Sequence, residues 1–107
     1  MTMSKEAETY ITQLIAYSGA ARSCFIKAID SYAAHDGSYE SLIEEGNNHF
    51  QLAHEAHFNL LQANPTESND GLMLLMHAED QMMCAETFKI IAERAKLLLQ
   101  DQSGNDQ

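Results

Sequence analysis

Apolar residues recur every three or four positions along most of this chain, the spacing that places side chains on one side of an α-helix. The pattern predicts helices over residues 7–34, 39–63 and 72–100. Between the first two lies His35-Asp36-Gly37-Ser38, where the glycine suits the backbone turn that ends a helix and Asp36 or Ser38 can accept amides of the next. This link allows only a helical hairpin. Residues 64–71, around Pro65, form the main loop.

The third segment differs from the other two because its mostly polar stripe is narrow, with apolar residues around most of the remaining circumference. Two neighbouring helices cannot cover so much apolar surface, so we expect this helix also to pack against copies of itself. The stripe consists of Glu79, Glu86, Lys89, Glu93, Lys96 and Gln100.

A chain of 107 residues fits a single domain over residues 1–107, and its polar end, residues 101–107, is expected to fray. The formal net charge of -10 argues against nucleic acid and anionic membranes as partners. Cys24 and Cys84 have no short ligand spacing, so neither a disulfide framework nor a cysteine zinc site is expected, and both cysteines are expected to be reduced. We find neither a signal-peptide pattern nor an apolar stretch of about 20 residues, so the expected location is the cytoplasm.

The five histidines suggest a metal site, but the spacings do not support one. His54 and His57 are three apart, whereas a zincin helix needs four, and no histidine has a glutamate three positions before it, as di-iron bundles require. His35 and His49 are expected to be solvated or capping residues. His54 and His57 are either half-buried helix residues or the rim of a site.

His77 stands out because a carboxylate shares its helix face in an otherwise apolar surface. At about 100° per residue, His77, Asp80, Gln81 and Cys84 share this face, while Glu79 points toward the polar stripe. A buried pair of this kind is either matched across an interface or kept for function, and a structural histidine explains the spacing equally well.

The chemistry that suits this pair is nucleophilic. A neutral imidazole can offer a lone pair to phosphorus while an acceptor on its other nitrogen fixes the tautomer, and no catalytic metal is needed. Gln81, His54 and helix amides are the available donors for the phosphoryl oxygens.

The residues around His77 match a known pattern. Leu75-Met76-His77-Ala78-Glu79-Asp80-Gln81-Met82-Met83 is similar to the Met-His-(Ala/Gly)-Gln-Asp-His-Leu-Met motif of the lactose/cellobiose-type IIA component of the bacterial sugar phosphotransferase system (PTS). Supporting stretches are residues 16–23, close to the family's Gly-Asp-Ala-Arg-Ser, residues 42–48, and Ala53-His54. The resemblance covers nearly the whole chain, from about Ile11 to Leu99.

This resemblance implies a three-helix protomer assembled as a homotrimer. In the family the first histidine of the motif accepts a phosphoryl group from the phosphocarrier HPr and passes it to a cysteine of the IIB component, which assigns the phosphohistidine to His77. The motif aspartate lies near the threefold axis, where magnesium can be shared, and this role falls on Asp80. Three carboxylates brought together must share a cation or hold protons.

Several positions depart from the family pattern. Glu79 replaces a glutamine and adds a negative charge two residues from the histidine, which should disfavour the phosphorylated state. Gln81 replaces the second motif histidine, and Ala20 replaces an aspartate. In the second helix the family's Glu-Ala-His-x-x-Gln becomes Leu52-Ala53-His54-Glu55-Ala56-His57.

The sequence therefore predicts an all-α, up-down-up antiparallel bundle of three helices, trimeric, that relays phosphoryl groups from HPr to IIB during uptake of a β-linked disaccharide. His77 is the predicted phosphohistidine and Asp80 the axial carboxylate, with Gln81, His54 and Glu79 as further candidates. The alternative is a trimeric regulatory or adaptor protein that has lost efficient transfer, and a metal-storage bundle is a third, weaker hypothesis.

Overall fold

The computed structural model describes residues 3–104, with side chains through Leu99, and this part of the chain is helical without any strand. The elements are α1 (Lys5–Ala34), α2 (Tyr39–Gln62), the short 3₁₀ helix η1 (Pro65–Glu67), α3 (Asn69–Glu93) and α4 (Ala95–Gly104). The predicted all-α class and the three long helices are confirmed. No described helix is both long and apolar enough to span a membrane.

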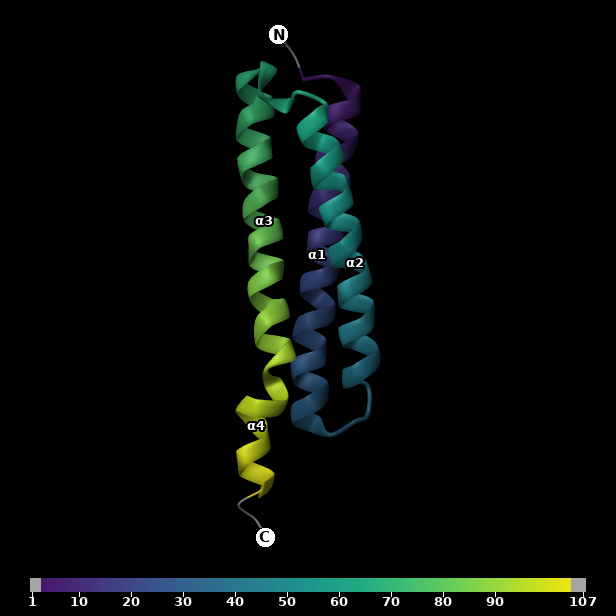
Figure 1. Cartoon of the computed structure of the whole chain (residues 1–107), viewed down its shortest axis with the longest axis vertical. Coiled ribbons are helices and arrows are strands. Elements are labelled where there is room, and N and C mark those ends of the chain that lie inside the picture. The colour runs from purple at the N-terminus through teal and green to yellow at the C-terminus, as the bar shows by residue number, and fades with distance from the viewer. Residues whose placement is uncertain (1–2, 105–107) are drawn as a thin grey trace.

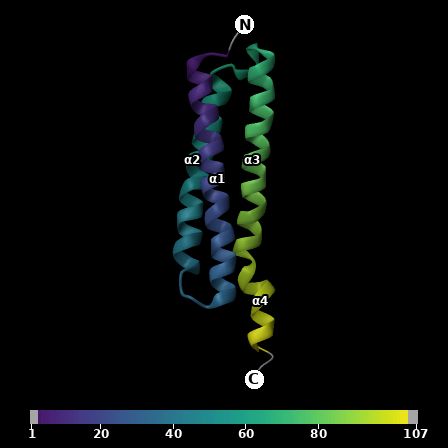
Figure 2. The same ribbon diagram turned by 180° about the vertical axis from the view of Figure 1, so that it is seen from behind.

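The helices form a narrow rod about 65 Å long (Figure 1). The α1–α2 turn lies at the end opposite the N-terminus, and the α2–α3 connection lies back at the N-terminal end. Both views place α1 between the other long helices, and α2 and α3 contact each other much less than each contacts α1 (Figure 2). One long side of α3 is therefore left without a neighbour.

Side-chain caps begin α1 and α3. The Ser4 hydroxyl accepts a hydrogen bond from the Ala7 amide (3.1 Å), and the Ser68 hydroxyl accepts one from the Gly71 amide (2.9 Å). Because these caps satisfy amides that have no partner within the helix, both helices begin a few residues before the first strongly apolar positions. This explains why α1 and α3 start two to three residues earlier than the periodicity predicts.

The α1–α2 turn is closed by polar contacts rather than by its glycine alone. His35, with φ 57°, is the left-handed residue that directly follows α1, although Gly37 also has positive φ. The Asp36 carboxylate accepts from the Ser31 hydroxyl and from the Ser38 amide, the latter at 3.0 Å. Both hydrogen bonds lower the pKa of Asp36, the one from Ser31 more than the one from Ser38. Asp36 thus binds the amide of Ser38, the residue directly before α2, and Ser38 itself gives no side-chain cap.

Two apolar clusters form the core along the rod. The cluster nearer the N-terminus contains Ala7, Ile11, Leu14, Ala53, Ala56, Leu60, Leu75 and Ala78. The cluster nearer the α1–α2 turn contains Ala21, Phe25, Ala28, Tyr39, Phe50, Ala85, Ala92 and Ala95. In this second cluster the fully buried Phe25 ring occupies the space over Gly46, where an added Cβ would lie 2.6 Å from the ring. The glycine therefore lets α1 and α2 approach closely.

The third predicted helix is interrupted. α3 ends at Glu93, the Arg94 amide bonds the carbonyls of both Ile90 and Ile91 (3.1 Å each), and α4 follows. The continuous helix predicted over residues 72–100 is wrong at this point. Whether residues 101–107 fray stays a prediction, because the α4 backbone continues through Gly104 and residues 105–107 lie outside the described part.

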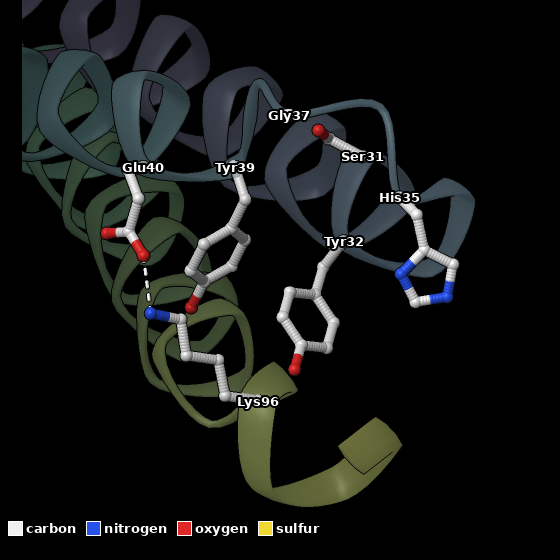
Figure 3. Close-up of a pocket in the computed structure, with 7 residues that line it drawn as sticks. All are labelled: Ser31, Tyr32, His35, Gly37, Tyr39, Glu40 and Lys96. Carbon is white, nitrogen blue, oxygen red and sulfur yellow. Dashed lines mark hydrogen bonds and ion pairs between the residues drawn. The ribbon is translucent and has the colours of Figure 1, made fainter. Parts of the chain in front are cut away.

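Contacts at the α3–α4 junction come from the start of α2. The Tyr39 hydroxyl donates to the Ala92 carbonyl (2.6 Å), and Lys96 pairs with Glu40 while its ammonium lies 5.3 Å from the Tyr39 ring centre. A cavity of about 330 Å³ opens between this junction and the α1–α2 turn (Figure 3). Burial raises the pKa of Tyr39. These tertiary contacts hold the junction where the chain changes direction.

Candidate functional site

His77 lies in the middle of α3, and both it and Asp80, one turn further on, are exposed. Within the described residues neither side chain makes a hydrogen bond or ion pair with another part of the chain. The pair is therefore not buried within a single chain, and its match across an interface or use in function stays a prediction. The physical reason is that the side of α3 that carries His77 and Asp80 faces away from α1 and α2.

The same side of α3 carries large apolar residues at heptad-like spacing. Met73, Met76, Met83 and Ile90 are between 49% and 69% exposed, and Asp80 lies midway among them. We call Met73, Met76, Asp80, Met83 and Ile90 the outward stripe. Alternating intervals of three and four residues are the pattern of a helix that packs against another helix. The surplus apolar surface expected on this helix is thus present in the single chain.

Glu79 faces inward, toward α2. Its Oε2 atom lies 2.7 Å from Nε2 of His57, and both side chains are partly buried, 36% and 21% exposed. The prediction that Glu79 lies off the face of His77 is confirmed, and the structure adds a partner on α2 that the polar stripe did not reveal. Two residues along a helix is a rotation of about 200°, so Glu79 lies almost opposite His77 and meets the neighbouring helix.

Gln81 and Cys84 face α1 rather than sharing a side with His77. Arg22 Nη1 lies 3.4 Å from Gln81 Oε1 and 4.0 Å from Cys84 Sγ. The predicted face of four residues is therefore divided between solvent and the α1 interface. Arg22 is a polar neighbour that sequence reasoning missed as a site residue, although it is the arginine of the α1 stretch that resembles the family.

His54 is exposed on α2, and its ring packs edge-on against Phe50 on the same helix, 4.6 Å between ring centres. No hydrogen bond links it to α3 among the described residues, so the structure does not bring His54 and His77 together within one chain. His57 is half-buried, which is one of the two alternatives predicted for it, whereas His54 is exposed.

The geometry leaves the His77 imidazole accessible. It is exposed and has no hydrogen-bond partner among the described residues, so another molecule can reach it from solvent. Two acids next to each other in sequence, Glu79 and Asp80, have opposite surroundings, since one is paired with a histidine and the other is bare.

Comparison with known proteins identifies the family. Residues 9–100 match the family described as "PTS system, Lactose/Cellobiose specific IIA subunit". The chain belongs to this family. It is a PTS IIA component, a class of protein that takes part in sugar phosphotransfer.

Two relatives illustrate the range of this IIA family. The oligo-beta-mannoside-specific EIIA component of Bacillus subtilis (strain 168) is 35% identical over 79 residues, which are 72% of each chain. The lactose-specific EIIA component of Staphylococcus aureus (strain N315) is 36% identical over 74 residues, 66% of this chain and 71% of the relative. No solved structure gave a match.

For a IIA component, the His57–Glu79 contact changes the meaning of two departures from the family pattern. Positions 57 and 79 correspond to glutamines in the family motifs, and here His57 and Glu79 form an acid–base pair. Nε2 of His57 lies 2.7 Å from the Glu79 carboxylate and holds it toward α2. The acid that replaces one glutamine of the family pattern thus meets the histidine that replaces the other.

Proposed function

We propose that this IIA component carries a phosphoryl group on His77 between HPr and a IIB protein. The observation that carries the proposal is the exposed, unpartnered imidazole of His77 on α3, at the histidine of the family motif. HPr as the donor makes the cytoplasm the proposed location. The sugars in the names of the two relatives, oligo-beta-mannoside and lactose, support a β-linked disaccharide or related oligosaccharide as the transported sugar.

The proposed relay consists of two displacements at phosphorus. A ring nitrogen of His77 attacks the phosphoryl group of phospho-HPr, so that a new N–P bond forms as the donor's N–P bond breaks. The thiolate of the IIB cysteine then attacks, an S–P bond forms, and the bond to His77 breaks. Neither step is a redox reaction, and the chain's task is to present the nucleophile and stabilise the phosphoryl oxygens.

We further propose that the protomer assembles as a homotrimer through the outward stripe. Its apolar side chains are exposed in the single chain, and their heptad-like spacing suits packing of α3 against copies of itself. Assembly around α3 would bring the α2 helix of one protomer near the α3 helix of another. His54 would join the site only in this way, as a donor from a neighbouring subunit.

Asp80 lies midway along the outward stripe, so that a threefold assembly would gather three carboxylates on its axis. Carboxylate oxygens suit magnesium, and like charges that meet must otherwise take up protons. Each chain offers the single carboxylate of Asp80 at this axis, and carboxylate oxygens suit a hard cation such as magnesium. Asp80 would hold the cation, which would offset the repulsion between the subunits.

The test is phosphorylation in a mixture of phosphoenolpyruvate, Enzyme I and HPr. The wild type should gain one acid-labile phosphoryl group per chain, and His77→Ala should gain none. His35→Asn is the matched control, because it removes another exposed histidine and asparagine tolerates the left-handed backbone of that position. If wild type stayed unmodified, or if His77→Ala were labelled as well as His35→Asn, the relay role would be lost, and the adaptor hypothesis would replace it.

A further inference from the structure

Three side chains with metal-binding chemistry meet on the α1–α2 hairpin, and none of them takes part in the site around His77. They are Cys24 from α1 and Glu45 and His49 from α2, and one ligand atom from each lies within 4.8 Å of the other two. The Cys24 thiol donates a hydrogen bond to Glu45 Oε2, with 3.5 Å between Sγ and Oε2. Cys24 is almost completely buried, His49 is half-buried and Glu45 is exposed.

The local fold explains why these residues converge. Glu45 and His49 are four residues apart on one helix and therefore project from the same face. Gly46, beside Glu45, allows α1 and α2 to approach closely over the Phe25 ring, and Cys24 immediately precedes that phenylalanine. The close approach of the two helices thus places the thiol opposite the carboxylate and the imidazole.

The His49 imidazole has a buried nitrogen without a hydrogen-bond partner among the described residues. This nitrogen is Nδ1, and it is shielded from solvent. Most buried polar side-chain atoms in proteins are satisfied, so an orphaned ring nitrogen beside a thiol and a carboxylate needs an explanation. A cation bound between the three side chains would give the ring a polar partner.

The donor set matches zinc. Zinc binds thiolate sulfur, imidazole nitrogen and carboxylate oxygen in tetrahedral geometry, which places neighbouring ligand atoms about 3.4–3.6 Å apart. The Cys24–Glu45 distance already falls in this range. Side-chain rotations that move the ligand atoms by roughly 1 Å would bring the remaining distances to tetrahedral values. Three protein ligands leave the fourth position open to water or to a ligand from another molecule.

We propose that Cys24, Glu45 and His49 form a zinc site that joins α1 to α2. On binding, the Cys24 thiol gives its proton to solvent and the sulfur takes the metal in its place. The site is independent of the proposed phosphoryl relay. Because zinc would bind the folded hairpin and hold its two helices together, it should stabilise the protein in proportion to its occupancy.

The test uses the full chain stripped of metal with a chelator and then titrated with zinc or cobalt. Calorimetry should show one zinc ion per chain, and zinc should raise the Tm. Cobalt should give a near-ultraviolet thiolate-to-cobalt charge-transfer band. Cys24→Ser should abolish that band, and both Cys24→Ser and His49→Gln should weaken zinc binding by at least about tenfold, the smallest effect expected for loss of a metal-site partner.

Matched controls separate this site from other histidines and acids. Cys84→Ser removes the second cysteine and Glu44→Gln the neighbouring exposed carboxylate, and both should bind zinc like wild type. His77→Ala should also bind zinc normally, so failure of the zinc site and failure of the phosphoryl relay are distinguishable. Equal zinc affinity in Cys24→Ser and Cys84→Ser, or a charge-transfer band that persists in Cys24→Ser, would overturn the proposal. If Cys24→Ser loses helicity, the zinc affinity of His49→Gln, measured by calorimetry, is used instead. A zinc affinity in His49→Gln equal to that of wild type would also overturn the proposal.

Discussion

The inward and outward sides of α3 are built from different kinds of residue. The buried positions, Gly71, Leu75, Ala78, Ala85 and Ala92, are mostly small. The exposed outward stripe is mostly methionine and isoleucine. Polar side chains follow the same division, because Glu79 and Gln81 have partners on α2 and α1 whereas Asp80 has none within the described chain.

This difference shows which contacts the protomer completes by itself. Small residues let α3 lie close to α1, so their identity is dictated by the space available. Methionine is flexible and adapts to irregular partners, which suits a surface that is covered by another molecule. The chain therefore satisfies the inward side of α3 by itself and leaves the outward side, with His77 on it, exposed.

The largest expected effect concerns the outward stripe. Met83→Asp should abolish self-association, because each subunit would add a second carboxylate beside Asp80 at the proposed axis. Light scattering should show a trimer for wild type and a monomer for the variant, with helicity unchanged by circular dichroism. Ile26→Asp, which changes an exposed isoleucine on α1, is the control and should remain trimeric. A trimeric Met83→Asp would show that the outward stripe is not the interface.

The next effect concerns the inward side. Ala85 is completely buried, so Ala85→Leu should lower the free energy of unfolding by about 1–3 kcal/mol through overpacking. Glu86→Leu introduces the same side chain at the adjacent exposed position, where a change within about 0.5 kcal/mol is expected. Urea denaturation at one fixed protein concentration measures both. Equal effects of the two variants would contradict the division of α3 into two sides.

A smaller effect is expected from the His57–Glu79 pair. His57→Gln leaves Glu79 without its partner and should slow phosphoryl uptake from phospho-HPr about two- to fivefold, the range expected of a partly exposed pair worth at most about 1 kcal/mol. Adding Glu79→Gln to that variant should restore the rate. Glu86→Gln removes a neighbouring exposed acid and serves as the control. The inferred compensation would be wrong if the double variant were as slow as His57→Gln alone.

The smallest effect lies outside α3, at the turn that closes α1 on α2. Asp36→Asn should lower the Tm slightly at pH 7, since the hydrogen bonds from Ser31 and Ser38 favour the ionised carboxylate. The pKa of Asp36 is lowered by folding, so its contribution is present above the ordinary aspartate value of about 3.9 and is lost as the pH falls through the lowered value. Thermal scans should show the Tm difference shrinking in that acidic range. A difference that persists below it would exclude this origin.

Local patterns gave most of the fold. Periodicity located the three long helices because each needs one apolar side, and capping side chains such as Ser68 explain the small errors at their ends. The interruption at Arg94 was missed because nothing local marks it. It coincides with the contacts that Tyr39 and Glu40 of α2 make with Ala92 and Lys96, more than 50 residues away in sequence.

The candidate site was predictable in identity but not in arrangement. The motif around His77 and the family were accessible from the sequence, and family membership is confirmed over residues 9–100. The predicted face around His77 was wrong for Gln81 and Cys84, which contact Arg22 of α1. Helix geometry gives only the angle between residues and not which angle meets a neighbouring helix. The proximity of Cys24 to Glu45 and His49 could not be predicted from residue spacing, because these residues lie on two different helices.

The sequence by itself determined the helices, their apolar sides, the family and the residue proposed to carry the phosphoryl group, because these depend on residue types and intervals within a single segment. Only the tertiary structure decided which side of α3 faces α1 and α2. That choice pairs Glu79 with His57, turns Gln81 to Arg22 and leaves His77 and Asp80 exposed. The physical reason is that such partners come from separate helices, and only close packing of the helices brings them within a few ångströms.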